Sequence, residues 1–216
     1  MKYTAGGFTL VELLVVVAIV AILASTLLSG HFVMRQRARL QQGRSEILML
    51  KTALEQYRTD FGDYPPSTLE ALSGRPGEGN GINEGNEAMT ACLTTSRMNG
   101  PYFYPAGPHD RRFRNLDMDS GSRDWTAWVF DDDELREIVD PWDNPYLYFH
   151  GRELRDGLSA SYQVGTRHVT VRPVRDDETD TFRSALTYQL WSFGLDGVND
   201  EGEGDDLANW TVQEQP

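Results

Sequence analysis

The segment "GGFTLVELLVVVAIVAILASTLL" (residues 6–28) decides the architecture of the chain, because it is a long apolar run that carries one carboxylate, Glu12. A charged side chain inside a membrane span costs roughly 2.5 kcal/mol or more, so Glu12 needs a partner. A membrane anchor takes about 20 apolar residues, and residues 8–28 meet that length. We therefore predict a single transmembrane helix over residues 8–30.

A cleaved secretory signal peptide is one alternative for this segment. It would need a basic n-region, an apolar core of about 7–15 residues and a cleavage site of the small-x-small type. Only Lys2 supplies the basic end, and no Ala-x-Ala sequence follows the apolar run. A plain membrane anchor with Glu12 at the interface is the other alternative.

The sequence "GGFTLVELL" resembles the processing site of type IV prepilins and type II secretion pseudopilins. The resemblance implies a leader over residues 1–7, cleavage by the prepilin peptidase between Gly7 and Phe8, and N-methylation of Phe8. It also implies that Glu12, at the fifth mature position, serves recruitment or assembly. The new α-amino group of a neighbouring subunit is a suitable counter-ion for Glu12, because breaking one partner of a buried ion pair costs about 3–5 kcal/mol.

The apolar run continues into an amphipathic segment at residues 31–61. Apolar residues recur there at three- and four-residue spacing, namely Ile47, Leu50, Leu54, Tyr57 and Phe61. This spacing is typical of a helix with one face against a core. Gly62 and the pair Pro65-Pro66 cannot continue a helix. We predict one helix from residue 8 to about residue 60.

The segment "YRTDFGDYPPSTLEAL" resembles the end of the long helix and the following loop in the major pseudopilin of type II secretion. Ser67 and Glu70 have the spacing of a capping box, which predicts a short second helix starting near Leu69.

The remainder of the segment at residues 62–133 predicts a loop and an inserted subdomain. Residues 74–85 are rich in Gly, Asn and Glu and predict an exposed loop. Residues 88–133 exceed the usual pseudopilin pattern, and their aromatic side chains indicate either a packed subdomain or a ligand-binding face. Cys92 is the only cysteine, so an intrachain disulfide is excluded and a buried thiol is expected.

Residues 134–216 predict a small sheet followed by an acidic loop. The sequence "DPWDNPYLYF" resembles the turn-and-strand element of pseudopilins. Runs of β-branched and aromatic residues predict strands at 146–150, 161–164, 168–175 and 186–193, with "RDDETD" as a hairpin tip between the last two. The predicted fold class is α+β, with a type IV pilin-like helix packed on a small antiparallel sheet.

The acidic loop carries six carboxylates, three glycines and no Lys or Arg between Asp196 and Asp206. Like charges at this density repel one another, so an ordered loop needs a cation. Calcium takes six to eight oxygen ligands at about 2.3–2.6 Å. The spacing is not that of an EF-hand, because Glu201 stands where the EF-hand has its glycine. A flexible acidic tail is the alternative.

The loop resembles the calcium loop of the major pseudopilin, which opens with Leu-Gly-x-Asp-Gly and closes with Asp-Ile-x-Asn-Trp. Here these appear as "FGLDG" at residues 193–197 and "DLANW" at residues 206–210. The resemblance implies calcium as the cofactor, and the candidate ligands are Asp196, Asp205, Asp206, Asp200, Asn199 and the backbone carbonyl of Phe193. We expect Trp210 to pack the closed loop onto the sheet.

The composition excludes two classes of function. The net charge of −13 argues against nucleic acid as a partner, because phosphate binding needs stripes of Lys and Arg. The four histidines are scattered and no nucleophile motif is present, so we expect no enzymatic activity.

The resemblance implies a structural subunit that polymerises into the periplasmic pseudopilus filament of a type II protein secretion system. It would lie in the bacterial inner membrane as a single-pass protein with its C-terminal domain in the periplasm. Its partners would be further copies, other pseudopilins, the prepilin peptidase and the inner-membrane secretion platform. The alternatives are a minor subunit of a type IV pilus and a membrane-tethered periplasmic binding module.

Overall fold

The computed structural model describes residues 9–107, 109–121, 129–130 and 132–212, and the side chains of all of these except residues 24–33. Its internal contacts divide the chain into residues 1–41 and residues 42–216. Helix α1 (Leu10–Phe61) begins in the first part and ends in the second.

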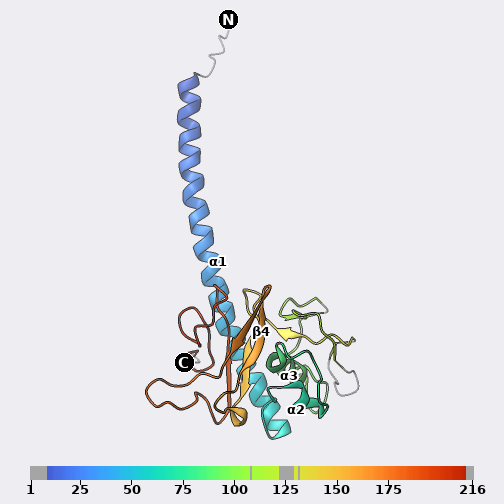
Figure 1. Cartoon of the computed structure of the whole chain (residues 1–216). Coiled ribbons are helices and arrows are strands. Elements are labelled where there is room, and N and C mark those ends of the chain that lie inside the picture. Colours follow the sequence, from blue (N-terminus) through green and yellow to red (C-terminus); the bar gives the residue numbers. More distant parts are fainter. Residues whose placement is uncertain (1–8, 108, 122–128, 131, 213–216) are drawn as a thin grey trace, which may run out of the picture. The chain divides into compact units, whose positions relative to one another are not determined.

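The described residues of the first part are Thr9 and the N-terminal turns of α1 (Figure 1). The large apolar side chains of residues 10–23 are all exposed, from 48% for Val16 to 79% for Leu10. Within the described residues, no helix is both long enough and apolar enough to cross a membrane. Of the span predicted at residues 8–30, Phe8 and the side chains of residues 24–30 lie outside the described residues.

The C-terminal turns of α1 bury the predicted apolar stripe. Ile47, Leu50 and Leu54 are fully buried and Tyr57 is 8% exposed. Phe61 is more exposed but stacks on Tyr57, with 4.4 Å between the ring centroids. The helix ends at Gly62, which has a positive φ of 83° that few other residues adopt. The predicted amphipathic helix and its end are therefore confirmed.

Helix α2 (Leu69–Ser73) confirms the short second helix, but its predicted cap is wrong. Thr68 is the N-cap, and its side chain accepts a hydrogen bond from the Ala71 N–H at 3.2 Å. Ser67 lies one residue earlier, and its hydroxyl accepts the His150 N–H at 2.6 Å. Serine and threonine can both serve as N-caps. The Ser67 hydroxyl already accepts a hydrogen bond from His150, so Thr68 caps the helix instead.

Helix α3 (Glu84–Leu93) was not predicted, and residues 85–93 are all buried. The exposed loop predicted at 74–85 therefore ends earlier, because Asn83 and Gly85 are also buried. Asn86 fixes the helix to the sheets. Its amide donates to the carbonyls of Ile138 (2.8 Å) and Tyr146 (2.7 Å), and its carbonyl accepts the Ile138 N–H at 2.7 Å. Cys92, also in α3, is buried as expected.

In the described part of the chain, six strands form three separate two-stranded antiparallel sheets. The strands are β1 (Phe113–Arg114), β2 (Glu137–Ile138), β3 (Leu147–His150), β4 (Ala160–Val164), β5 (Arg167–Val171) and β6 (Tyr188–Trp191). β1 pairs with β2, β3 with β6 and β4 with β5. A short 3-10 helix, η1 (Gly151–Glu153), follows β3. The α+β class is confirmed, although the prediction was of one sheet.

A tyrosine side chain links β3 and β4, which belong to different sheets. The Tyr162 hydroxyl accepts the Tyr148 N–H at 3.1 Å and donates to the Tyr148 carbonyl at 3.2 Å. The backbone N–H and carbonyl of Tyr148 therefore both have a hydrogen-bond partner in the side chain of Tyr162, without backbone pairing between β3 and β4 at this position.

The predicted strand at 168–175 is shorter in the structure. β5 ends at Val171, shortly before Pro173, which lacks the N–H that a ladder requires. Residues 175–182 form their own tight turn, with an isolated bridge between Arg175 and Phe182. The acidic turn is therefore confirmed, but it does not join two paired strands, because β5 and β6 belong to different sheets.

Three aromatic side chains of the middle segment pack with one another, whereas Tyr104 is 67% exposed. Phe103 and Phe113 are buried, with 5.7 Å between their ring centroids, and Phe130 lies 5.3 Å from Phe113. Trp125 and Trp128 lie outside the described residues. The described aromatic residues thus support the packed subdomain. In Figure 1, α2 and α3 lie together beside the strands.

Candidate functional site

The acidic segment at residues 193–206 is a loop whose two ends are held side by side. The Ser192 N–H donates to the Leu207 carbonyl at 2.9 Å, and the Asn209 N–H donates to the Leu190 carbonyl at 2.8 Å. An antiparallel bridge joins β6 to Ala208 between these bonds. The loop therefore begins and ends on neighbouring extended segments.

Trp210 lies directly after this paired base. Its ring is tilted against that of Trp191, with 5.7 Å between the centroids, and Trp191 is fully buried in the core. The expectation that Trp210 packs the closed loop onto the sheet is confirmed. A flexible acidic tail is inconsistent with this packing.

Gly194 allows the two arms of the loop to approach each other. Its φ is +63°, and a Cβ at this position would lie 2.6 Å from the Asp205 carbonyl and 2.7 Å from a carboxylate oxygen of Asp205. Real Cβ atoms do not approach other atoms this closely. Glycine is needed here for both the conformation and the space.

Three of the predicted ligands come together in the loop. Asp196, Asp200 and Asp205 each offer one carboxylate oxygen, and these three oxygens lie within 4.8 Å of one another. Two oxygens bound to one calcium ion at about 2.3–2.6 Å are separated by no more than about 5.2 Å. The three donors are oxygens, the type of ligand that calcium prefers, and they are fewer than the six to eight ligands that the ion takes.

Backbone amides orient two of these carboxylates. Asp205 accepts the N–H groups of Leu195 at 2.5 Å and Asp196 at 3.2 Å. Asp196 accepts the N–H of Val198 at 2.8 Å. In metal sites, hydrogen bonds of this kind fix the orientation of the carboxylates that bind the ion.

Asp206 lies outside this group of three carboxylates. Its Oδ2 accepts the N–H groups of Asp200 at 2.9 Å and Gly202 at 3.1 Å, while its Oδ1 is buried without a hydrogen-bond partner. Burial raises the pKa of Asp206 to about 7, against the opposing effect of these two hydrogen bonds. Asp206 therefore shapes the middle of the loop, and its role as a ligand stays a prediction.

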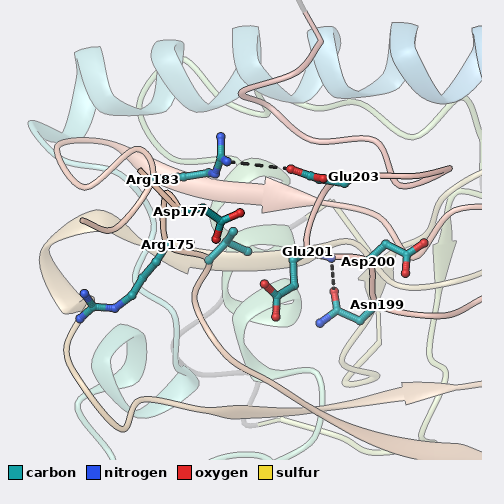
Figure 2. A pocket seen from close by; sticks show the side chains of 8 residues that line it. Arg175, Asp177, Arg183, Asn199, Asp200, Glu201 and Glu203 are labelled. Atoms are coloured by element: carbon teal, nitrogen blue, oxygen red, sulfur yellow. Dashed lines mark hydrogen bonds and ion pairs between the residues drawn. The ribbon is translucent and has the colours of Figure 1, made fainter. Parts of the chain in front are cut away.

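Asn199, whose role as a ligand stays a prediction, has contacts with the core and with the loop. Its Oδ1 accepts the indole N–H of Trp191 at 3.0 Å and the N–H of Glu201 at 3.3 Å; Figure 2 shows the second contact. Asn199 thus anchors the loop to the core. The side chain of Phe193 is fully buried, and its carbonyl as a ligand stays a prediction.

A depression of about 290 Å³ lies between the acidic loop and the turn at residues 175–182. Its lining residues, drawn in Figure 2, are Val174, Arg175, Asp177, Arg183, Asn199, Asp200, Glu201 and Glu203. Arg183 lies between the two sides, 4.0 Å from Glu203 and 3.8 Å from Asp176. Such partly exposed pairs contribute at most about 1 kcal/mol each, so Arg183 holds the loop only weakly.

The predicted processing site is described only from Thr9 onward, because Gly7 and Phe8 lie outside the described residues. Glu12 lies in the first turn of α1 and forms a capping box with Thr9. Its Oε2 accepts the Thr9 N–H at 2.9 Å and the Thr9 hydroxyl at 2.7 Å, and its own N–H donates to that hydroxyl at 3.2 Å. The Thr-x-x-Glu spacing could have predicted this local partner.

Two family models match the chain. A model described as the prokaryotic N-terminal methylation motif matches residues 4–28, and a model described as type II secretion system protein G matches residues 32–127. No solved structure matches the chain significantly.

Several curated proteins are similar to the chain, all of them named type II secretion system core protein G. The protein from Pseudomonas aeruginosa is 30% identical over 126 residues, which cover 55% of this chain and 89% of that protein. The protein from Aeromonas hydrophila is 36% identical over 77 residues, or 35% of this chain and 54% of that protein. The Escherichia coli protein is 36% identical over 72 residues, which cover 32% of this chain and 50% of that protein. The chain thus spans about half the length of the latter two relatives.

Proposed function

Because the chain belongs to the type II secretion system core protein G family and has an α+β, type IV pilin-like fold, we propose that it polymerises into the periplasmic pseudopilus of such a system. The observation that carries this proposal is the similarity over 89% of the Pseudomonas aeruginosa protein. The role is structural and not enzymatic. No comparison favours a pilus subunit or a binding module.

The N-terminal segment would act in processing and anchoring. The prepilin peptidase would cut between Gly7 and Phe8 and Phe8 would be methylated, as the match to the methylation motif at residues 4–28 supports. The exposed apolar side chains of residues 10–23 need cover, because burying one of them contributes roughly 1.5–3 kcal/mol. Lipid of the inner membrane would cover them before assembly, with the C-terminal domain in the periplasm, and helices of neighbouring subunits would cover them afterwards.

Glu12 would set the axial position of each subunit. It is the only carboxylate in the apolar segment, and its partner Thr9 leaves it exposed at the start of α1. In a filament, the α-amino group of a neighbouring Phe8 would pair with it. The partners would be further copies of the chain, other pseudopilins and the secretion platform of the inner membrane.

Calcium would order the acidic loop. Asp196, Asp200 and Asp205 would supply the carboxylate oxygens, and the cation would neutralise their mutual repulsion. Asp206 and Asn199, with their contacts to backbone and core, would keep the loop in the shape that binds the ion. An ordered loop presents one fixed surface to a neighbouring globular domain, and this is the contribution of calcium to assembly.

The first test is the intact mass and N-terminal fragment spectrum of the protein isolated from its native membrane. The proposal requires a chain that begins at methylated Phe8. An intact Met1 would indicate a plain anchor, and a chain that begins beyond residue 24 would indicate a signal peptide. Either of these results refutes the proposal.

The second test is assembly in cells that overproduce the secretion system. Glu12→Ala should abolish filaments while the protein level stays unchanged. Glu178→Ala, which removes the same charge from an exposed turn, is the control and should assemble normally. Normal filaments with Glu12→Ala would contradict the pairing.

A further inference from the structure

Four acidic side chains that the proposed function does not use lie together in the globular part of the chain. Glu87 is on α3, Asp117 and Asp119 lie between β1 and β2, and Glu137 is on β2. Glu87 and Glu137 are fully buried. Acidic residues are almost never fully buried unless they have a partner, so this cluster requires an explanation.

Three of these side chains point one oxygen each to a common position. One carboxylate oxygen of Glu87, one of Asp117 and one of Glu137 lie within 4.8 Å of one another. This separation is within the limit of about 5.2 Å for two oxygens on one calcium ion. The three residues come from three different segments, so a shared ligand would join those segments.

As a carboxylate, Glu87 has no hydrogen-bond donor for either of its oxygens, and the carboxyl group of Asp119 lies within hydrogen-bond reach of it. Both Glu87 oxygens are buried, and Asp117 Oδ1 is likewise buried without a donor. Among the described residues, none of the ion pairs involves these four carboxylates. A buried charge without a partner is among the most costly groups in a protein, which points to a ligand between these side chains.

The outer contacts of the cluster hold its members in place. Glu137 accepts the Asn83 side-chain N–H at 2.7 Å and the Leu116 N–H at 2.9 Å. Asp117 accepts the Asn80 side-chain N–H at 3.1 Å. Hydrogen bonds of this kind orient metal-binding carboxylates and leave their remaining lone pairs for the ion.

We propose that Glu87, Asp117 and Glu137 bind a second divalent cation with a preference for oxygen ligands, of the calcium class, separate from the ion of the C-terminal loop. Asp119 lies beside this position and adds negative charge to it. The ion joins α3 to β2 and to the segment that precedes β2. It therefore stabilises the globular part independently of filament assembly.

The competing explanation is a proton shared within the cluster. Burial, followed by the charges of Asp119, Glu137 and Asp117, raises the pKa of Glu87 to about 11. A protonated Glu87 can donate to Asp119. Cation and proton differ in one measurable respect, because only the cation changes the number of calcium ions that the chain binds.

The test is a calcium titration by calorimetry on the full chain in detergent, after removal of metals with a chelator. The wild type should bind two ions per chain. Glu87→Gln keeps the size of the side chain but removes its charge, and it should bind one ion. Asp196→Asn should also bind one ion, and the double variant none. Glu84→Gln, an acidic neighbour outside the group of three, is the matched control and should bind two.

Unchanged calcium stoichiometry in Glu87→Gln would overturn the proposal in favour of the shared proton. If Glu87→Gln fails to fold, Asp117→Asn provides the same test at a less buried side chain, and two ions bound by that variant would overturn the proposal. If Asp196→Asn binds as many ions as the wild type while Glu87→Gln binds one fewer, the site in the C-terminal loop falls and the second site stands.

Discussion

Replacing Gly194 by alanine should disable the acidic loop while leaving the rest of the fold intact. The added Cβ would meet the Asp205 carbonyl oxygen, carboxylate oxygen and carbonyl carbon at 2.6, 2.7 and 2.8 Å. The arm that carries Asp205 must therefore move. Gly165→Ala is the matched control, because Gly165 has a similar φ of +59° but no atom within 4 Å of the added Cβ.

The difference in stability between the two variants can be estimated. A left-handed conformation costs an L-residue about 1–2 kcal/mol, and both variants bear this cost. Overpacking adds about 1–3 kcal/mol, and only Gly194→Ala bears it. For a chain of this size, 1 kcal/mol shifts the melting temperature by about 2–4 °C. We therefore expect Gly194→Ala to melt roughly 2–12 °C below Gly165→Ala.

The assay is thermal unfolding of both variants and the wild type in detergent, with saturating calcium and with chelator, followed by a calcium titration. Gly194→Ala should bind calcium more weakly at the loop, because the displaced Asp205 is one of its three carboxylates, whereas Gly165→Ala should bind it as the wild type does. Equal melting temperatures and equal calcium affinities for the two variants would refute the role of this close approach.

Three further predictions rest on separate contacts. A chelator should lower the melting temperature of the wild type, and Asp196→Ala should show a smaller response to it; an identical response would contradict calcium binding at the loop. Asn86→Ala leaves buried polar groups of α3 and the sheets without partners, at about 1–3 kcal/mol for each, so urea denaturation should show a loss of several kcal/mol. Burial raises the pKa of Asp140 to about 7 from 3.8, so its protonated form is favoured in the fold and stability is lost as pH rises between these values. The advantage of Asp140→Asn over the wild type should therefore grow from pH 4 to pH 7, up to about 4 kcal/mol at about 1.4 kcal/mol per pKa unit, and parallel pH curves of unfolding free energy would contradict it.

Local patterns in the sequence were sufficient for the elements that have a local cause. The stripe of Ile47, Leu50 and Leu54 predicted which face of α1 is buried, and Gly62 predicted where the helix ends. The opening and closing sequences of the acidic loop predicted its position and the packing of Trp210.

Features that depend on distant contacts could not be predicted in this way. Helix α3 starts with Glu-Gly-Asn, which resembles a loop, and it is held in place by hydrogen bonds of Asn86 to Ile138 and Tyr146, 52 and 60 residues away. The contact of the Tyr162 hydroxyl with the backbone of Tyr148, which links two strands of different sheets, likewise has no signal in the local sequence. The hydrogen bond from the Trp191 indole to Asn199 could also not be predicted from the spacing of the loop residues.

The base of the acidic loop is closed by backbone hydrogen bonds between residues 190–192 and 207–209. The length of the loop can therefore change without a change in the register of these two segments. Because the base closes the loop, additional residues between its two arms raise the closure entropy by only about 0.6 kcal/mol for each doubling of length. Insertions and deletions between Asp196 and Asp205 can therefore accumulate in related chains without disturbing β6. Cation affinity and the shape of the presented surface can diverge while the globular domain continues to fold in the same way.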